Sequence, residues 1–348
     1  MIRLFEMFAG YGGASWALKK AGFDFECVGY SEIYEGAITC YDRNFPGIKN
    51  YKDCRDIDPG QLPDFDLLTG GFPCQPFSEA GDHRGELDTR GTLFYDIIRI
   101  AEKKKPRYIF LENVVGLTFQ NHRRTYDKIL SELNRVGYKV YPKVMNSQNY
   151  GTPQRRERVY FVCYRKDIDN GFEFPKEEKP GVLLKDLVDP PSKEALVSVA
   201  IRNKLRSKAQ ALGVPYGTFP IEYHLKHYVD AGISYAVKSA THEFMVGTMK
   251  DVESANLELK KSGITSPKDC FRFLMSKNIR PLTPKEAFRL MGFFDDEIDL
   301  SGLTQSQKYR LAGDGWDVGL VAKILAKMLK RAESEKPKIA VQQRLTPY

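Results

Sequence analysis

The chain has 348 residues, of which 42% are hydrophobic, so it can bury a sizeable core as one large domain or two unequal ones. Its formal net charge of +8 permits a polyanionic partner without proving one. No apolar run approaches the roughly 18 residues of a membrane span, and Met1 leads directly into a predicted strand rather than a signal peptide. These features exclude a membrane-spanning protein and lead us to expect a cytoplasmic one.

The cysteine and histidine pattern predicts no metal site. Six cysteines and five histidines are present, but no pair of cysteines has the C-x-x-C spacing and no cluster has the spacing of zinc ligands. In the cytoplasm these thiols stay reduced, and one of them can be reactive as a thiolate.

The first half of the chain alternates short apolar strands with helical patterns. Strands are predicted over residues 2–7, 25–30, 65–69, 108–112, 140–146 and 159–165. Helices are predicted over residues 14–21, 34–44, 93–103 and 126–136. This alternation is typical of an α/β fold with a Rossmann-like, mostly parallel sheet that helices cover on both faces.

The second half of the chain differs in character. Residues 166–191 read as a polar, proline-containing linker, and residues 214–277 show no clear period. Further helices are predicted over residues 194–212, 283–291 and 319–330. We therefore expect a main domain (1–180), a smaller irregular domain (181–279), a return to the main domain (280–330) and a polar tail (331–348).

A glycine-rich turn, Phe8–Gly13, follows the first strand. Its glycines let the backbone approach a ligand closely, and Glu32, at the end of the second strand, suits ribose hydroxyls. Such a turn could bind a dinucleotide. However, Ser15 stands where the G-x-G-x-x-G pattern needs its third glycine, and the G-x-G-G spacing fits S-adenosylmethionine better.

A lone cysteine, Cys74, lies in the loop Gly70–Ser78. The loop follows an apolar strand, so the thiol is expected at the carboxyl edge of the sheet, where open α/β sheets bind their ligands. An isolated cysteine is usually a small buried hydrophobe, but three other segments here supply the polar groups that a reactive thiol needs. These segments are Phe8–Gly13, Glu112–Val114 and Gln154–Arg158.

In order and spacing, these segments resemble the DNA (cytosine-5)-methyltransferase family over about residues 1–165 and 278–330. The resemblance implies an enzyme that transfers a methyl group from S-adenosylmethionine, its cofactor, to carbon 5 of cytosine in a specific double-stranded DNA sequence. Because that atom is unreachable inside a duplex, the target base would be flipped out. The reaction would pass through a covalent Cys74–cytosine intermediate.

The resemblance also assigns catalytic roles. The Cys74 thiolate would add to carbon 6 of the cytosine, which makes carbon 5 nucleophilic. Glu112 would hold ring nitrogen 3 and the exocyclic amino group, and Asn113 would brace the neighbouring backbone. Arg158 would bind the carbonyl oxygen of the cytosine, and Arg156 would lie near the cysteine loop and a phosphate.

Cofactor contacts are implied in the same way. The adenine would lie between Phe8 and Ile33, and Asp53 would accept a hydrogen bond from its amino group. Asp314, in the segment Gly313–Gly315, would complete the methionine end of the pocket, where the family usually has asparagine. The implied cofactor-binding residues are Phe8, Gly10, Gly12, Gly13, Glu32, Ile33, Asp53 and Asp314.

Target choice is expected in the segment that precedes Arg280–Thr283. Residues 185–279 carry more basic than acidic side chains, and the resemblance implies that this segment reads the DNA sequence in the major groove. A solvated helix face is the alternative interpretation of the basic residues over 202–208. The residues expected to contact DNA are Gln75, Ser78, Arg90, Arg202, Lys204 and Arg206.

Two other functions stay open on the sequence. A tRNA cytosine methyltransferase would share these motifs, but that branch typically has Pro-Pro-Cys where this chain has Phe72-Pro73-Cys74. A DNA-binding module on an inactive fold would not need Cys74, Glu112 and Arg158 together. We expect double-stranded DNA as the partner, a cognate restriction endonuclease that acts independently, a monomeric state, and a cytoplasmic location at the nucleoid through DNA.

Overall fold

The computed structural model describes residues 1–73, 93–178, 181–189 and 282–329, together with short stretches between 227 and 281. The helix predicted over 194–212 and the tail from 331 lie outside the described residues. None of the helices in the described part combines the length and the apolar character that spanning a bilayer demands. The predicted site residues that lie outside the described part are Cys74, Gln75, Ser78, Arg90, Arg202, Lys204 and Arg206.

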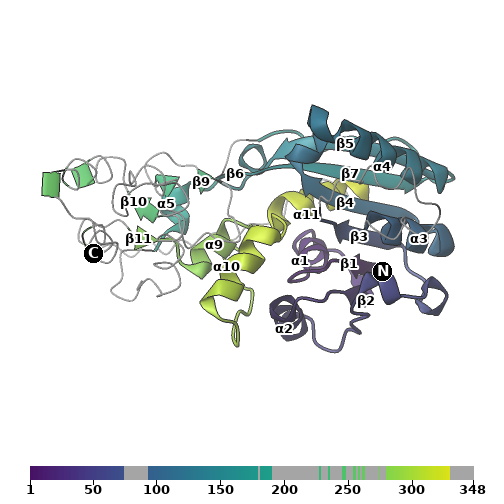
Figure 1. Ribbon diagram of the computed structural model, residues 1–348, viewed down its shortest axis with the longest axis horizontal. Helices are drawn as coiled ribbons and strands as arrows, with labels where there is room; N and C mark the ends of the chain where they lie inside the picture. The colour runs from purple at the N-terminus through teal and green to yellow at the C-terminus, as the bar shows by residue number, and fades with distance from the viewer. Residues whose placement is uncertain are drawn as a thin grey trace.

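A six-stranded sheet forms the centre of the main domain (Figure 1). Its strand order is β2-β1-β3-β4-β7-β5. Strands β1 to β4 run parallel to one another, whereas β7 is antiparallel to both of its neighbours. The predicted Rossmann-like, mostly parallel sheet is therefore confirmed. The strands span Ile2–Met7 (β1), Phe25–Ser31 (β2), Leu67–Gly71 (β3), Tyr108–Val114 (β4), Tyr138–Asn146 (β5) and Glu157–Arg165 (β7).

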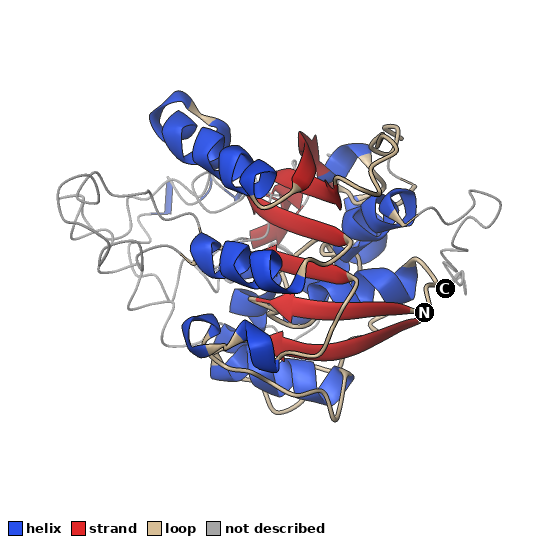
Figure 2. Ribbon diagram, turned by 90° about the vertical axis from the view of Figure 1, so that its right-hand side faces the viewer, coloured by secondary structure: helices blue, strands red, loops and turns tan. Residues whose placement is uncertain are grey.

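Helices cover both faces of this sheet, as predicted (Figure 2). On one face, α3 and α4 pack against Ile109 and Leu111 of β4. On the other face, α1 and α11 pack against Phe110 of the same strand. β4 therefore buries alternate side chains on opposite faces, which is why it reads as a continuous apolar run. The helices span Gly13–Lys20 (α1), Phe94–Lys104 (α3), Arg123–Arg135 (α4) and Val318–Met328 (α11).

Two helices differ from the sequence-based expectation. α10 (Gln305–Asp314) lies where no element is predicted, and α5 (Leu184–Leu187) lies within the predicted linker. Much of α10 is polar, so its apolar pattern is weak; the capping box of Thr304 and Gln307 is its clearest start signal. Further bounds are Glu35–Asn44 (α2), Pro284–Arg289 (α9), Cys54–Asp56 (η1), Pro59–Gln61 (η2), Val115–Thr118 (η5), Gln120–His122 (η6) and Ser147–Asn149 (η7).

Short strands connect the main domain to the segment between 190 and 281. β6 (Gln154–Arg155), which directly precedes β7, pairs in parallel with β9 (Ser234–Tyr235). β10 (Met245–Gly247) pairs with β8 (His227–Tyr228) and with β11 (Arg280–Pro281). The segment is thus tied to the main domain through β6.

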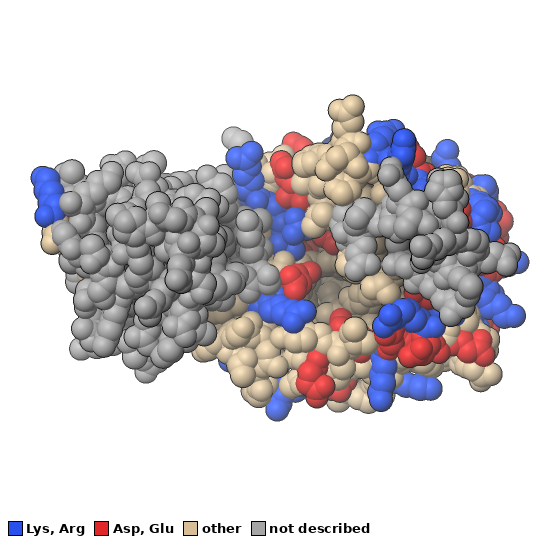
Figure 3. Space-filling view, viewed as in Figure 1, with Lys and Arg blue, Asp and Glu red and all other residues tan. Residues whose placement is uncertain are grey.

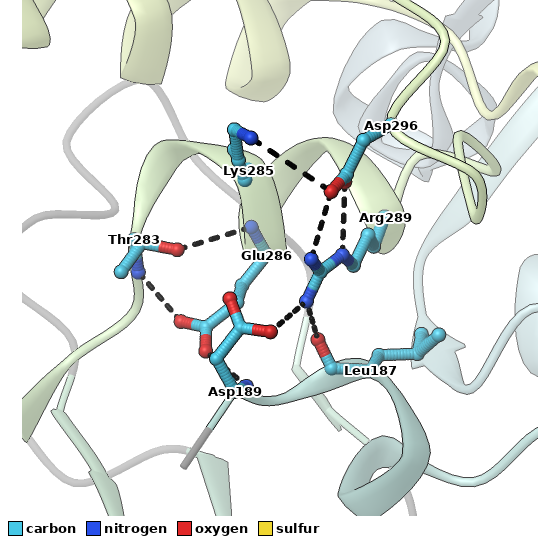
Figure 4. Close-up of polar contacts among 7 residues, drawn as sticks. All are labelled: Leu187, Asp189, Thr283, Lys285, Glu286, Arg289 and Asp296. Carbon is cyan, nitrogen blue, oxygen red and sulfur yellow. Dashed lines mark hydrogen bonds and ion pairs between the residues drawn. The ribbon is translucent and has the colours of Figure 1, made fainter. Parts of the chain in front are cut away.

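Asp189 and Thr283 flank residues 190–282, and a buried carboxylate binds the backbone at both points (Figure 4). Glu286 of α9 accepts the backbone N–H of Asp189 at 2.7 Å and that of Thr283 at 2.7 Å. Arg289, almost one turn further along, donates to the Leu187 carbonyl at 3.0 Å and to the Asp189 carboxylate at 2.8 Å. We call these five residues the junction cluster.

Replacing Glu286 by glutamine should lower the free energy of unfolding by about 1.5–3 kcal/mol, because the amide nitrogen cannot accept from a backbone N–H. Urea denaturation measures the change. Glu102→Gln is the matched control, since Glu102 is an exposed partner of Arg135 and its loss should cost less than about 1 kcal/mol. Equal losses in the two variants would contradict the importance of the junction cluster.

Candidate active site

The predicted site residues gather where the parallel strands end, at one edge of the sheet. Phe8 follows β1, Glu32 follows β2, and Glu112 lies near the end of β4; Phe72, which follows β3, leads toward the predicted Cys74 loop. β7 runs in the opposite direction, so its first residues reach the same edge, and the register pairs Arg158 with the last residue of β4. This pairing register brings Arg158 to Glu112.

A cavity lies at this edge between β1 and β3, where the strand order reverses. Doubly wound α/β folds bind their ligands at such a point. The face in Figure 3 is hollowed near the middle of the described surface, and charged side chains of both signs surround the hollow. The cavity lining includes Phe8, Gly10, Gly13, Glu32, Asp314 and Trp316.

The glycine turn of this cavity suits a closely bound ligand. Gly10 and Gly12 have φ values of 56° and 87°, in the left-handed region that glycine adopts at low cost. A Cβ at Gly12 would lie 2.8 Å from the Phe45 ring, whereas a Cβ at Gly10 would meet no atom within 4 Å. Phe8, half-buried at the cavity, has an uncommon positive φ of 52° for a residue with a side chain.

Glu32 organises the glycine turn. Its carboxylate accepts the backbone N–H of Gly10 at 2.9 Å, of Ile33 at 2.9 Å and of Tyr34 at 2.8 Å. An ionised carboxylate has about four acceptor positions, so the three N–H groups leave capacity for a ligand hydroxyl. The neighbouring residue Ile33 is 67% exposed.

Two predicted cofactor acids are placed differently from each other. Asp53 is not part of the lining of this cavity. Hydrogen bonds from the guanidinium and backbone N–H of Arg55 hold the pKa of the Asp53 carboxyl below its usual value. Asp314, the last residue of α10, lines the cavity and lies 3.4 Å from Arg310. Its carboxylate and the terminal carbonyls of α10 together favour a cation.

Glu6, a buried acid of β1, lines the cavity although it is not among the predicted site residues. It accepts the Ala14 N–H at 3.1 Å, the Tyr41 hydroxyl at 2.9 Å and the Ser15 hydroxyl. It thereby caps α1, whose N-cap residue, Gly12, has no side chain. Burial raises the pKa of Glu6 to about 7, although these hydrogen bonds oppose the shift.

The stability of the protein relative to a Glu6→Gln variant should fall as the pH rises from 4.5 to about 7. In this range the folded state keeps the Glu6 proton and the unfolded state loses it, so the proton-linked stabilisation disappears. The difference in unfolding free energy should decrease by about 3 kcal/mol across the range. Urea denaturation at several pH values measures it, and a difference independent of pH would contradict the raised pKa.

Glu112 and Arg158 form an ion pair at the sheet edge. Arg158 Nε lies 2.9 Å from Glu112 Oε1, and both side chains are largely buried. Burial raises the pKa of Glu112, although the charges of Arg158 and Arg156 and a hydrogen bond from the Trp316 side chain oppose the shift. Such a carboxyl is suited to share or exchange a proton with a bound group.

Asn113 links this ion pair to the chain that enters the cysteine loop. Its side-chain amide donates to the Phe72 carbonyl at 2.8 Å, and its oxygen accepts the Val114 N–H at 2.8 Å. The described chain continues to Pro73, one residue before Cys74. The predicted bracing of the backbone by Asn113 is confirmed.

Arg156, which is predicted to lie near the cysteine loop and a phosphate, is buried against the segment around Asp314. The residue is only 2% exposed, and its guanidinium donates to the carbonyls of Gly313 at 3.1 Å and Gly315 at 2.7 Å. Burial lowers its pKa to about 10. Arg156 therefore fixes the backbone around Asp314.

Comparison with known proteins assigns the family. A family model for the C-5 cytosine-specific DNA methylase matches residues 2–330. The chain belongs to the C-5 cytosine-specific DNA methylase family. The Type II methyltransferase M.NlaX of Neisseria lactamica is 34% identical over 342 residues, which cover 96% of this chain and 98% of that protein. M.HaeII of Haemophilus aegyptius is 35% identical over 333 residues, which cover 93% and 92%.

Solved structures share the fold of this methylase. The crystal structure of a Spodoptera frugiperda DNMT2 mutant has a TM-score of 0.74 at 21% identity and covers 94% of this chain and 100% of that one. The S. pombe Dnmt2 methyltransferase has a TM-score of 0.70 at 19% identity and covers 94% and 98%. At these identities the likeness concerns the fold.

As a C-5 cytosine DNA methylase, the protein is an enzyme that methylates cytosine in DNA and takes the methyl group from S-adenosylmethionine. The cavity fits this cofactor in its donor and acceptor groups. The backbone at Gly10 is open to a ligand, and Glu32 offers a hydrogen-bond acceptor. Asp314 offers a negative charge, and the rings of Phe8 and Trp316 form an apolar part of the cavity wall.

Proposed function

We propose that this methylase acts on a specific double-stranded DNA sequence, with the target cytosine flipped out and bound covalently by Cys74 during the reaction. The supporting observation is the buried Glu112–Arg158 pair, which lies at the same sheet edge as the cofactor cavity. Asn113 joins this pair to the chain that enters the Cys74 loop. A base must leave its stack to reach groups buried at such an edge.

The proposed chemistry needs a nucleophile because carbon 5 of cytosine reacts poorly by itself. The Cys74 thiolate forms a bond to carbon 6, and the displaced π electrons make carbon 5 nucleophilic. Bound S-adenosylmethionine would supply the methyl group that carbon 5 takes up, with S-adenosylhomocysteine as the leaving group. Transfer of the carbon 5 proton to a solvent water then breaks the bond between carbon 6 and sulfur and releases the Cys74 thiolate.

Glu112 and Arg158 would bind the flipped ring on its polar edge. Glu112 holds nitrogen 3 and the exocyclic amino group, which favours the addition by stabilising positive character on the ring. Arg158 binds the carbonyl oxygen with its planar fork while it also fixes the Glu112 carboxylate. Asn113 and Arg156 act as positioning residues through the backbone groups that they bind.

The cofactor contacts are part of the proposal. Phe8 and Ile33 flank the adenine, Glu32 accepts from the ribose hydroxyls, and Asp314 attracts the methionine ammonium. Asp53 accepts a hydrogen bond from the adenine amino group. Its ion pair with the exposed Arg55 is weak, so this hydrogen bond can replace it. In the turn formed by residues 10–13, Gly10 supplies open backbone beneath the cofactor.

We further propose that 181–279 is the target-recognition domain and that 1–180 and 280–330 form the catalytic domain. The junction cluster supports this division because it fastens both ends of the intervening segment to the catalytic domain. The pairing of β6 with β9 supports it as well. The proposed DNA contacts are Gln75, Ser78, Arg90, Arg202, Lys204 and Arg206.

A restriction context is proposed by likeness to the relatives named Type II methyltransferases. In that context the enzyme would work as a monomer in the cytoplasm, beside an endonuclease that acts on the same site independently.

The test is the transfer of tritium from methyl-labelled S-adenosylmethionine to duplex DNA and, in parallel, to tRNA. We expect label in duplex DNA alone. Label in tRNA alone would point to a tRNA methyltransferase, and label in neither would point to a binding module. Bisulfite sequencing of DNA from an expressing host then identifies the methylated sequence.

A further inference from the structure

Trp316 forms part of the wall between the cofactor cavity and the Glu112 carboxylate. Its ring lines the cavity and packs edge-to-face on Phe110 of β4, with ring centroids 5.3 Å apart. A Cβ placed on Gly13, the first residue of α1, would lie 3.3 Å from the same ring. The Tyr11 hydroxyl donates to the Trp316 carbonyl, so the backbone of this residue is also fixed from the glycine turn.

The other edge of the indole reaches the Glu112 side chain. A Cβ placed on Gly71, the last residue of β3, would lie 2.8 Å from Trp316 Nε1 and 3.5 Å from Glu112 Oε2. The indole nitrogen and the carboxylate therefore converge beside one residue that has no side chain, and the Trp316 side chain hydrogen-bonds Glu112. Because an indole N–H can only donate, Glu112 is the acceptor.

Glu112 is thus held by donors from two parts of the structure. Arg158 Nε, at 2.9 Å, comes from β7 on the side of the predicted substrate groups. The Trp316 N–H comes from the segment after α10, which lines the cofactor cavity. A change in the position of the Trp316 ring would therefore move one of the two hydrogen bonds that orient the carboxylate.

We propose that Trp316 is a positioning residue that couples the cofactor cavity to Glu112, so that an occupied cavity fixes the carboxylate in the orientation that binds the target cytosine. The inference rests on the proposed role of Glu112 in binding the base. Coupling of this kind is reciprocal: the cofactor must raise the affinity for target DNA by the same factor by which DNA raises the affinity for the cofactor.

The chain provides a matched control, because it has two tryptophans. Trp16 is buried in α1 against Phe45 and Phe293, and its indole nitrogen has no hydrogen-bond partner among the described residues. Trp16→Phe and Trp316→Phe therefore make the same chemical change, but only the second removes a hydrogen bond to Glu112.

The experiment measures the affinity for a duplex that contains the sequence the enzyme methylates. It is made with and without S-adenosylhomocysteine, for the wild type and both variants. We expect S-adenosylhomocysteine to raise DNA affinity in the wild type and in Trp16→Phe by a factor in the range of about 5–150. In Trp316→Phe this factor should fall to within about twofold of one. The affinity for S-adenosylhomocysteine alone, measured by calorimetry, should stay within about fivefold of the wild-type affinity, because an aromatic ring still lines the cavity.

A pH profile and a second variant distinguish a loss of coupling from a general loss of structure. The pH dependence of methyl transfer should shift upward in Trp316→Phe, because the lost N–H favoured the ionised form of Glu112. Gly71→Ala is a second variant that keeps the tryptophan but places a methyl group against its Nε1, and it should lose the same coupling.

Retention of the full coupling factor in Trp316→Phe, or an equal loss in Trp16→Phe, would overturn the inference. A Glu112→Gln variant shows which claim has failed. If Glu112→Gln methylates DNA normally, the proposed role of Glu112 is wrong. If it is inactive while Trp316→Phe stays coupled, only the role of Trp316 is wrong.

Discussion

Replacing Glu112 by glutamine should lower kcat for DNA methylation by about 10²–10⁴-fold, the range typical of a lost general acid. Glutamine keeps the shape of the side chain but cannot share a proton with nitrogen 3 of the cytosine. The wild-type rate should decline as the pH rises through the raised pKa of Glu112, since the protonated form is the acid. This limb of the pH profile should be absent from the variant.

Steady-state methylation assays over pH 5 to 9 check this expectation, and cofactor calorimetry confirms that the variant is folded. Glu102→Gln, at an exposed glutamate far along α3, should keep the wild-type rate and pH profile. A Glu112→Gln enzyme with normal kcat would remove the residue from the chemistry. A normal kcat with a raised KM would instead assign it to binding alone.

The second large effect is expected at Cys74. Cys74→Ser should lose methylation by several orders of magnitude, as enzymes do when their nucleophile is removed, yet still bind duplex DNA. Duplex DNA that contains 5-fluorocytosine should trap the wild-type enzyme covalently, because carbon 5 then carries no proton to eliminate. The serine variant should form no such adduct.

Peptide mapping of the trapped complex identifies the reactive thiol. Among the described cysteines, Cys27, Cys40, Cys54 and Cys163 are buried, and burial raises the pKa of each thiol, which makes them poor nucleophiles. Cys270→Ser is the control that should trap as the wild type does. An adduct on any cysteine other than Cys74 would contradict the proposed mechanism.

Much of the catalytic edge could be predicted from the sequence because parallel strands end on the same side of a sheet. The run Tyr108–Leu111 predicts a buried strand, and an acid directly after it must lie at that edge. The distance between Glu112 and Arg158 could not be predicted in the same way. It depends on the antiparallel register of β4 and β7, which the side-chain pattern of either strand leaves free.

Other features were beyond sequence reasoning for different reasons. Glu6 is a single acid in an apolar strand, and its role as a cap for α1 needs the strand and the helix terminus in contact. The buried position of Arg156 follows from the carbonyls of Gly313 and Gly315, more than 150 residues away along the chain. The sequence Gln154–Arg158 is compatible with either an exposed or a buried side chain at each of its three arginines. Tertiary contacts decide which arginine is buried.

The junction cluster makes the segment between Asp189 and Thr283 an insertion whose two ends are fastened to one side chain, Glu286. For a loop with fixed ends, each doubling of length adds only about 0.6 kcal/mol of closure entropy. A segment of quite different length would therefore cost the rest of the fold little, because the contact of Arg289 with Leu187 lies outside the segment. If the segment recognises DNA as proposed, its recognition surface can therefore change without a change in the contacts of the junction cluster.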